Sequence, residues 1–282
     1  MTQRWNNVAI IGVGLIGGSI GLALRQRGLA KEIVGIGRRQ ANLKKAIDSG
    51  AITSAALKIA DGVAAADVVI ACTPVGEIVS HLLEAAAMAP DQALLTDAGS
   101  TKGSIVSKLE SGLAKGKHFV GSHPLAGSEK TGVDFARVDL FQGRVVVITQ
   151  TRRTKPDDIK AATDFWSALG ATVQVMSPDS HDKALATTSH LPHLVASAVA
   201  QSTMKAELPL TAGGWCDVTR VAGGDVDLWA QILIDNRANI LRSLARFGKT
   251  VEEFQTALES ENSDKLRQLL TEGKNVRDAL GN

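Results

Sequence analysis

The first two thirds of the chain alternate short apolar runs with longer stretches in which apolar residues recur three and four positions apart. The runs predict buried strands and the longer stretches predict helices. We expect strands over residues 8–11, 32–36, 67–72, 93–96, 119–121, 144–149 and 172–176, and helices over 16–26, 40–48, 76–88, 102–113 and 156–169. Strands that alternate with helices in this way predict a parallel sheet covered on both faces.

The pattern changes close to Ser177 and Pro178, after which helical periodicity continues with almost no strand signal. The clearest helices are expected over residues 194–206, 227–247, 251–259 and 263–279. The sequence therefore predicts an α/β protein, with an N-terminal Rossmann-type doubly wound parallel sheet followed by an all-helical C-terminal domain. We place these domains at residues 1–177 and 178–282.

A glycine-rich turn joins the first expected strand to the first expected helix. Its residues are Gly12, Val13, Gly14, Leu15, Ile16 and Gly17, which form a G-x-G-x-x-G motif. Glycines here permit a tight turn, close approach of the backbone to a pyrophosphate, and packing of the helix on the strand. The helix N-terminus then offers N–H groups to the anion. This context predicts that the N-terminal domain binds a dinucleotide.

The end of the second strand indicates which dinucleotide is preferred. An Asp or Glu at this point would bind the ribose hydroxyls of NAD. The chain instead has Gly37, Arg38 and Arg39, and two guanidinium groups suit the 2′-phosphate of NADP. NADP is therefore favoured, and NAD bound through the backbone is the alternative.

Composition excludes several other classes of protein. Of 282 residues, 44% are hydrophobic and 21% are charged, and the formal net charge is +2, which predicts a globular protein rather than a nucleic-acid binder. Cys72 and Cys216 match no metal or redox spacing and fit a reducing compartment. The uncharged stretch 8–24 contains five glycines, which favours the glycine turn over a membrane span. We expect a cytoplasmic protein with no membrane or nucleic-acid partner.

Four later segments carry polar residues in an uncommon order. They are Asp97-Ala98-Gly99-Ser100-Thr101-Lys102, Gly121-Ser122-His123-Pro124-Leu125-Ala126-Gly127-Ser128-Glu129, Ser189-His190-Leu191-Pro192-His193 and Asp217-Val218-Thr219-Arg220-Val221-Ala222. In this order after a glycine turn, the chain resembles the prephenate/arogenate dehydrogenase family of tyrosine biosynthesis, from about residue 8 to 236. The resemblance implies oxidative decarboxylation of prephenate to 4-hydroxyphenylpyruvate, or of arogenate to tyrosine, with hydride transfer to NAD(P).

The resemblance also implies two catalytic residues. His123 would accept the proton of the ring hydroxyl, a role that suits a side chain titrating near neutral pH. Ser100 would hydrogen-bond both His123 and that hydroxyl. The alternative for Ser100 is a capping residue for the helix expected to begin near residue 102.

Substrate contacts are implied for five further residues. Arg220 would bind a substrate carboxylate through its fork of donors, and Asp217 could hold that guanidinium in place, although an ordinary ion pair is the alternative. His193 would contact substrate from the helix that Pro192 begins. His190 and His193 lack a third ligand at suitable spacing, so no metal site is expected.

Glu129 would take part in an ionic gate, with a solvated residue as the alternative. Trp229 would lie near the substrate unless it is a core residue, and Thr73 and Pro74 would border the nicotinamide ribose. Relatives of this architecture dimerise through their helical half, so a homodimer is expected.

Two other functions remain open at this point. The first is another two-domain Rossmann dehydrogenase, of the β-hydroxyacid dehydrogenase or imine reductase type, which needs a Lys or Asp on the first long helix of the helical half. That helix offers only Lys205 near its end. The second is a non-catalytic NADP-binding sensor, which has no need of His123, Ser100 and Arg220 together.

Overall fold

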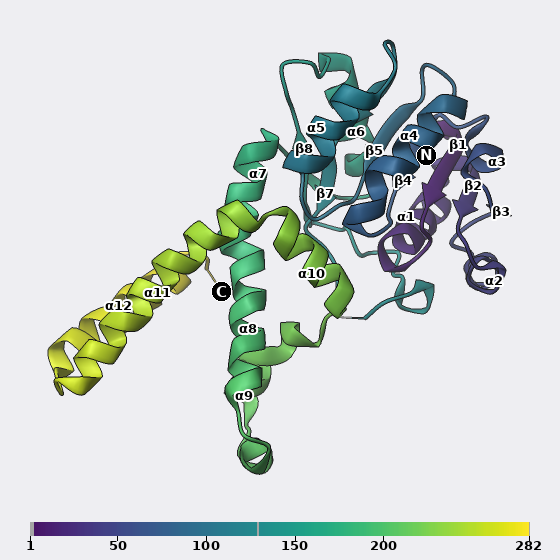
Figure 1. Ribbon diagram of the computed structural model, residues 1–282. Coiled ribbons are helices and arrows are strands. Elements are labelled where there is room, and N and C mark those ends of the chain that lie inside the picture. Colours follow the sequence, from purple (N-terminus) through teal and green to yellow (C-terminus); the bar gives the residue numbers. More distant parts are fainter. Residues whose placement is uncertain (1–2, 129, 282) are drawn as a thin grey trace. The chain divides into compact units, whose positions relative to one another are not determined.

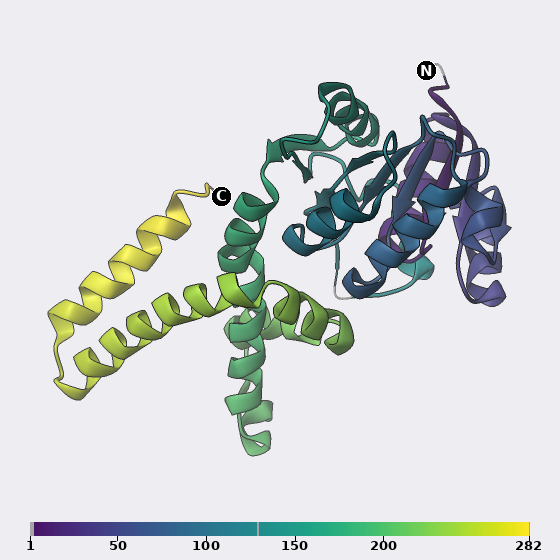
Figure 2. The same ribbon diagram turned by 45° about the horizontal axis from the view of Figure 1, so that its top comes forward.

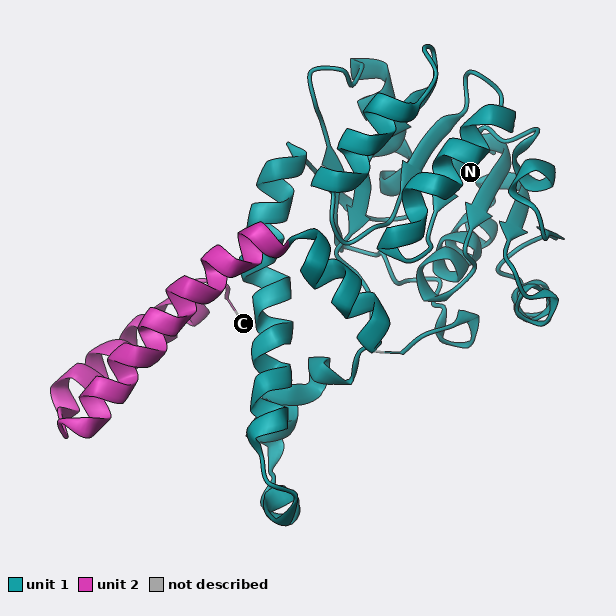
Figure 3. Cartoon of the chain, in the orientation of Figure 1, with its two compact units in different colours: residues 1–236 teal, residues 237–282 magenta. Residues whose placement is uncertain are grey.

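The computed structural model describes residues 3–128 and 130–281, and these residues form two compact units. The first unit spans residues 1–236 and the second spans residues 237–282 (Figure 3). Among the described residues, the first unit contains every strand and the second contains two helices.

Six parallel strands form the main sheet of the first unit. They are β1 (Trp5–Ile11), β2 (Ala30–Ile36), β3 (Ser54–Ala56), β4 (Val68–Ala71), β5 (Leu94–Asp97) and β6 (His118–Val120). Their order is β3-β2-β1-β4-β5-β6, and every adjacent pair is parallel. This order is that of the dinucleotide-binding Rossmann fold, in which ligands bind where the strand order reverses, between β1 and β4. The predicted fold class is confirmed.

Helices cover both faces of this sheet because successive strand residues point to opposite sides (Figures 1 and 2). Val8 and Ile10 of β1 pack into one apolar cluster, while Ala9 and Ile11 pack into the other. The first cluster includes side chains of α1 (Leu15–Gln26), α2 (Gln40–Asp48) and α6 (Pro156–Ala168), and the second those of α3 (Ile59–Val63), α4 (Val75–Met88) and α5 (Gly103–Gly112).

The expectation of one continuous parallel sheet is wrong for the last strands. β7 (Ser122–Pro124), β8 (Val145–Thr149) and β9 (Thr172–Met176) form a separate sheet, in which β7 runs antiparallel to β8. The chain leaves the main sheet at Gly121, where a Cβ atom would lie 2.5 Å from Oγ1 of Thr149. Only glycine allows this close approach, which brings the following residue pair, Ser122 and His123, alongside β8.

A continuous helical run follows the second sheet. It comprises α7 (Pro178–Leu185), a π-helical turn (Ala186–His190) and α8 (Leu191–Ser202). The wide turn precedes Pro192, which lacks an N–H group and whose ring would clash with the carbonyl four residues earlier in a regular α-helix. Two short 3-10 segments follow, η3 (Lys205–Leu210) and η4 (Arg220–Gly223), with α9 (Gly213–Thr219) between them.

The single helix expected over residues 227–247 is wrong, because the structure has two helices there. α10 (Val226–Asp235) ends at Asn236, and α11 (Arg237–Glu259) begins directly after it. Asn236 is buried, and its side-chain amide donates to the backbone oxygen of Asp182 at 2.7 Å. This tertiary hydrogen bond stabilises the break between α10 and α11, and the periodicity of the sequence could not predict it.

The second unit is a helical pair of α11 and α12 (Ser263–Asp278). α11 runs through the break that we expected between residues 247 and 251. Asn262 caps α12 by accepting the N–H of Lys265 at 3.0 Å, and the Lys265 ammonium lies 3.0 Å from Glu253 of α11. In neither stretch of described chain is a helix both long and apolar enough to cross a membrane.

Candidate active site

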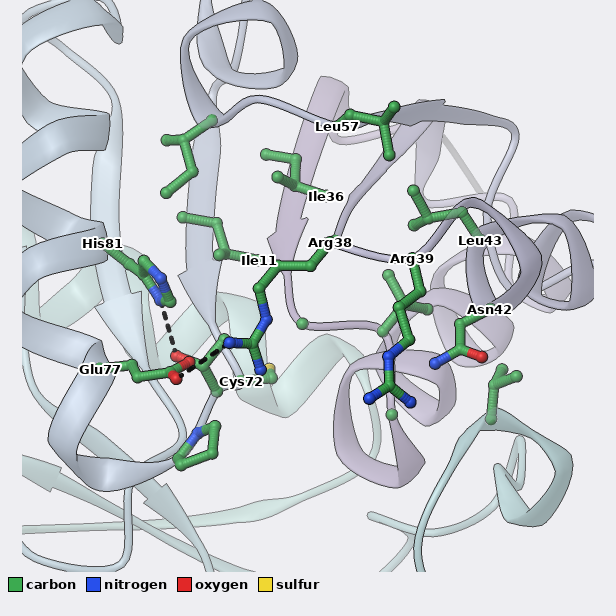
Figure 4. Close-up of a pocket in the computed structure, with 18 of the residues that line it drawn as sticks. Ile11, Ile36, Arg38, Arg39, Asn42, Leu43, Leu57, Cys72, Glu77 and His81 are labelled. Carbon is green, nitrogen blue, oxygen red and sulfur yellow. Dashed lines mark hydrogen bonds and ion pairs between the residues drawn. The ribbon is translucent and has the colours of Figure 1, made fainter.

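A cavity of about 700 Å³ lies at the carboxyl ends of β1, β2 and β4, where the strand order reverses (Figure 4). Six of the nine residues expected to bind the cofactor line it: Gly12, Gly14, Arg38, Arg39, Thr73 and Pro74. The other three, Leu15, Ile16 and Gly17, form the first turn of α1 behind it. Asn42, Lys45 and Lys58 add further polar groups to the lining.

The three glycines of the motif meet three different needs. Gly12 adopts a φ of 92°, which other residues rarely adopt, and a Cβ on Gly17 would lie 2.2 Å from the Gly12 oxygen. A Cβ on Gly14 would meet no protein atom within 4 Å. Gly14 thus leaves open space in front of the N-terminus of α1, where N–H groups face an anion. The shape fits the pyrophosphate of a dinucleotide.

Basic side chains line the cavity beyond the end of β2. Both Arg38 and Arg39 are exposed, and their side chains extend into the same region (Figure 4). Arg38 lies 3.5 Å from Glu77 of α4 in an ion pair that is largely open to solvent, so the pair contributes little to stability. Thr73 hydrogen-bonds His81 of the same helix at 3.1 Å.

A second group of polar side chains surrounds His123 on β7. Its Nδ1 atom lies 2.8 Å from Nε2 of His181, the buried histidine of α7. On its other side, Nδ1 of His181 lies 2.8 Å from Oδ1 of Asp182. The Asp182 carboxylate also accepts the N–H groups of Lys102 and Gly103, both at 2.8 Å. Three elements of the fold therefore hold this chain of side chains.

A buried ion pair fixes the segment that carries His123. The ammonium of Lys102 contacts Asp97 at the end of β5, and both side chains are fully buried. Lys102 also donates to the oxygen of Ser122 at 2.8 Å, and the Ser122 N–H donates to Asp97 at 3.1 Å. These bonds join the carboxyl edge of the main sheet to the first residue of β7, so the position of His123 depends on the main sheet.

Two more histidines lie on the same helical run, next to Trp229 of α10. Nδ1 of His190 lies 3.1 Å from the amide nitrogen of Asn236. His193 stacks on Trp229 with ring centroids 3.5 Å apart and planes 12° apart. Nδ1 of His193 is buried and has no hydrogen-bond partner in the described chain, which is uncommon for a buried polar atom.

Burial favours the neutral form of the imidazole rings at this site. Desolvation, followed by repulsion from His181, Lys102 and His190, lowers the pKa of His123 well below its ordinary value. Burial lowers the pKa of His190 to about 4 and also lowers that of His193. A neutral imidazole keeps one unprotonated nitrogen, which can accept a proton.

Comparison with known proteins identifies the family of the chain. Residues 20–175 match the family model for the prephenate dehydrogenase nucleotide-binding domain, and residues 177–272 match the model for its dimerization domain. The chain belongs to the prephenate dehydrogenase family. It is 33% identical to the prephenate dehydrogenase of Bacillus subtilis over 99% of this chain and 77% of that relative.

Solved structures of prephenate and arogenate dehydrogenases have the same fold. The prephenate dehydrogenase of A. aeolicus, in complex with hydroxyphenyl propionate and NAD+, has a TM-score of 0.90 and 31% identity, covering 99% of this chain and all of that one. The arogenate dehydrogenase of Synechocystis has a TM-score of 0.82 and 27% identity, covering 97% of this chain and 99% of that one. As a prephenate dehydrogenase family member, the chain catalyses the oxidative decarboxylation of tyrosine biosynthesis.

The structure brings together only some of the residues that the family resemblance implies. It places His123 of β7 against His181 of the helical run, and it stacks His193 of α8 on Trp229 of α10. Arg220 is exposed at the start of η4, a segment that packs on α8, and Asp217 is exposed on α9. Glu129 lies outside the described residues.

Ser100 follows β5 and is partly buried. In the described chain its hydroxyl makes no hydrogen bond with His123, whose Nδ1 contacts His181 instead, so the catalytic role of Ser100 stays a prediction. Its alternative role as a helix cap is not seen, because α5 begins at Gly103 with Lys102 as its N-cap residue and no side-chain cap.

Sequence reasoning missed the residues behind His123. His181 and Asp182 fall in a stretch that we interpreted only as helical, and Lys102 was noted only as part of a motif. The adjacent His and Asp were the available signal, but their partner His123 lies 58 residues earlier. His190, considered only as a metal ligand, proves to be a buried hydrogen-bonding residue.

Proposed function

We propose that His123 is the base of the reaction and that prephenate or arogenate binds beside it. The observation that carries this proposal is the placement of its imidazole. The ring is partly exposed and follows the carboxyl edge of the sheet that also borders the cofactor cavity, and the lowered pKa of His123 favours its neutral form. With Nδ1 already bonded to His181, Nε2 is the nitrogen left to accept the hydroxyl proton.

The cofactor cavity and His123 have different roles in the proposed reaction. A nicotinamide held in the cavity would supply the hydride acceptor, while the protein orients the substrate and His123 receives the proton of its ring hydroxyl. Loss of carbon dioxide then makes the ring aromatic. Ser100 sits after β5 at the same sheet edge, which supports a contact with the same hydroxyl.

Substrate carboxylates require cationic groups, and the proposal assigns this role to Arg220. Its guanidinium offers paired donors that match a carboxylate. The contact between η4 and α8 supports this assignment because it keeps Arg220 near the segment that carries His193. We retain Asp217, Trp229 and Glu129 as proposed substrate-site residues.

For the cofactor, we propose that NADP is preferred. Arg38 and Arg39 line the cavity at the end of β2, where NAD-specific proteins carry an acidic residue. Lys58 adds a third cation to the lining. NAD as the preferred cofactor is the alternative that the assay below tests.

We further propose that residues 1–177 bind the dinucleotide and that residues 178–282 complete the substrate site and form a homodimer. The match of residues 177–272 to a dimerization domain supports the dimer. So do large apolar side chains that are more than 60% exposed, which a dimer interface would cover: Leu241, Leu258, Leu270 and Val276 of α11 and α12.

One assay tests the proposed reaction. Absorbance of the reduced nicotinamide is followed with prephenate, arogenate and 3-hydroxyisobutyrate, each with NAD and with NADP. We expect turnover with prephenate or arogenate and none with 3-hydroxyisobutyrate. Turnover of 3-hydroxyisobutyrate alone would indicate a β-hydroxyacid dehydrogenase, and NADP binding without any turnover would indicate a sensor.

The role of His123 is tested by His123→Asn in the same assay. Loss of a general base lowers kcat by about 10²–10⁴ and leaves KM little changed. His118→Gln is the control, because His118 hydrogen-bonds Asp158 at 2.6 Å near the opposite end of the sheet strands. Wild-type turnover by His123→Asn would disprove the assignment.

A further inference from the structure

The side chains behind His123 form an ordered line that ends at a carboxylate. His123 contacts His181, and His181 contacts Asp182, through two hydrogen bonds of 2.8 Å each. Asp182 accepts the backbone N–H groups of Lys102 and Gly103 at the start of α5. Both His181 and Asp182 are buried, so water does not compete for these bonds.

The carboxylate of Asp182 is ionised and can only accept hydrogen bonds. Burial alone would raise the pKa of Asp182, but hydrogen bonds from His181 and from the two backbone N–H groups outweigh it, so the pKa lies below its usual value. An ionised carboxylate offers no proton. Nδ1 of His181 must therefore carry the proton of the bond between them.

The proton on Nδ1 of His181 determines where the proton of His123 lies. Burial lowers the pKa of His181, although Asp182 opposes the shift, so the ring is neutral and carries a single proton. With Nδ1 of His181 protonated, its Nε2 has only a lone pair. The 2.8 Å bond to His123 then requires His123 to donate from Nδ1.

We propose that Asp182 and His181 are positioning residues that hold His123 in the Nδ1–H tautomer. In that tautomer Nε2 is unprotonated, so it accepts the substrate hydroxyl proton. After transfer the protonated ring still donates from Nδ1, and the buried carboxylate at the end of the line stabilises its charge while remaining ionised. The inference rests on the proposed function, because it explains how His123 becomes a base.

The opposite tautomer has no place in this arrangement. If Nε2 of His181 carried the proton, Nδ1 of the neutral ring would direct its lone pair at the Asp182 carboxylate, 2.8 Å away. Two acceptors at that distance repel each other. The other charged or titratable groups that act on His123 are Lys102 and His190, and neither occupies its Nδ1 atom.

The tautomer itself can be measured without turnover. Protein labelled with 15N in its histidines gives distinct NMR shifts for protonated and unprotonated ring nitrogens, and the His123 signals are assigned by their loss in His123→Asn. We expect Nδ1 of His123 to be protonated and Nε2 unprotonated near neutral pH. A protonated Nε2 in the wild-type protein would overturn the proposal, whatever the activity of His123→Asn.

Substitutions of His181 separate positioning from simple stability. His181→Leu removes the acceptor, and we expect kcat to fall about 10–100-fold, with the KM values for substrate and cofactor unchanged. In His181→Gln the amide oxygen can accept from His123, so most of the lost kcat should return. Equal losses in His181→Leu and His181→Gln, or wild-type kcat in His181→Leu, would contradict the proposal.

Asp182→Asn gives a sharper test if the variant folds. The new amide group would donate to Nδ1 of His181, so His181 would carry its proton on Nε2 and donate it to Nδ1 of His123. His123 would then be forced into the Nε2–H tautomer. Exchange of a tautomer-fixing Asp for Asn in serine proteases lowers kcat about 10⁴-fold for the same reason. His118→Gln is again the matched control, because it removes a comparable His–Asp bond, and it should keep wild-type kcat and the wild-type His123 tautomer.

Discussion

The ring of His193 lies flat against the indole of Trp229, with centroids 3.5 Å apart. This contact joins α8 to α10, and α10 is hydrogen-bonded in turn to α4 and to the segment that precedes α5. Gln231 of α10 accepts a hydrogen bond from the N–H of Gly76 at 3.2 Å, and Asp235 accepts one from the hydroxyl group of Thr101 at 2.6 Å. The orientation of His193 thus depends on the domain that holds the cofactor.

The stacked pair should show a measurable coupling. Stacked aromatic rings contribute about 0.5–1.5 kcal/mol beyond the area they bury. A double-mutant cycle of His193→Ala and Trp229→Ala, followed by urea unfolding, should give a coupling energy in that range. Trp229→Phe, which keeps a stacking surface, should retain part of it. Additive effects of the two substitutions would contradict the contact.

Two glycines of the cofactor turn should respond differently to alanine. Gly14→Ala meets no protein atom, so the unfolding free energy should change by about 0.5 kcal/mol or less. The new methyl group occupies the space facing the pyrophosphate, and cofactor affinity should fall at least about tenfold, or about 1.4 kcal/mol. Gly17→Ala instead clashes with the Gly12 oxygen and should destabilise the fold by about 1–3 kcal/mol.

The two arginines after β2 should determine the preference for the phosphorylated cofactor. A hydrogen bond to a charged group contributes about 1.5–3 kcal/mol, so Arg39→Ala should weaken NADP binding about 10–150-fold. The Kd for NAD should stay within about threefold, since NAD has no 2′-phosphate to pair with. Titration of each cofactor by fluorescence measures both values, and the same titration applies to Arg38→Ala.

Lys31→Ala provides the control for these variants. Lys31 is also exposed but lies at the amino end of β2, on the opposite edge from the cavity. Its replacement should change neither Kd. If Arg39→Ala and Arg38→Ala bound NADP as tightly as the wild type does, the preference would not come from these guanidiniums.

Acid should destabilise the protein through His190. Burial lowers the pKa of His190 to about 4, although Asp182 opposes the shift and His181 and His193 add to it. The unfolded chain, with an ordinary pKa of about 6.5, binds this proton at higher pH than the folded chain does. The contribution of neutral His190 to the free energy of unfolding is therefore fully present above about pH 6.5. As the pH falls from there toward about 4, this contribution decreases by about 1.4 kcal/mol per pH unit.

Urea unfolding at about pH 7.5 and about pH 5 measures this loss. In His190→Asn the side-chain oxygen can still accept from Asn236 but cannot bind a proton, so the decrease in stability between the two pH values should be smaller. His81→Asn, which removes a histidine outside the buried group, should retain the wild-type decrease. The hypothesis fails if His190→Asn and the wild type lose equal stability.

Much of the fold could be predicted from local patterns. The expected bounds of α2 and β9 match the structure to the residue, because periodicity and turn residues specify both elements locally. β3 and α3 were missed because three and five residues are too few for a period to show. The second sheet was missed because its separation depends on the contact between Gly121 and Thr149.

The same distinction between local motifs and tertiary contacts applies to the site. Local motifs were enough to predict Gly14 and Arg39 at the cofactor cavity, since both lie within one strand–turn–helix unit. The partners of His123 could not be predicted, because they come from α7 and from the start of α5. Only the tertiary fold brings the side chains of His181 and Asp182 to that histidine.

The π-helical turn at Ala186–His190 sets the phase of the histidines on either side of it. In a regular α-helix each residue advances by about 100°, so His193 would lie about 120° around the axis from His181. The wide turn takes up about one extra residue, which reduces that angle to about 20°. Deleting a single residue from this turn would leave a regular helix with one step fewer, which again gives about 20°, so the ring that stacks on Trp229 would stay on the side of the helix that carries His181.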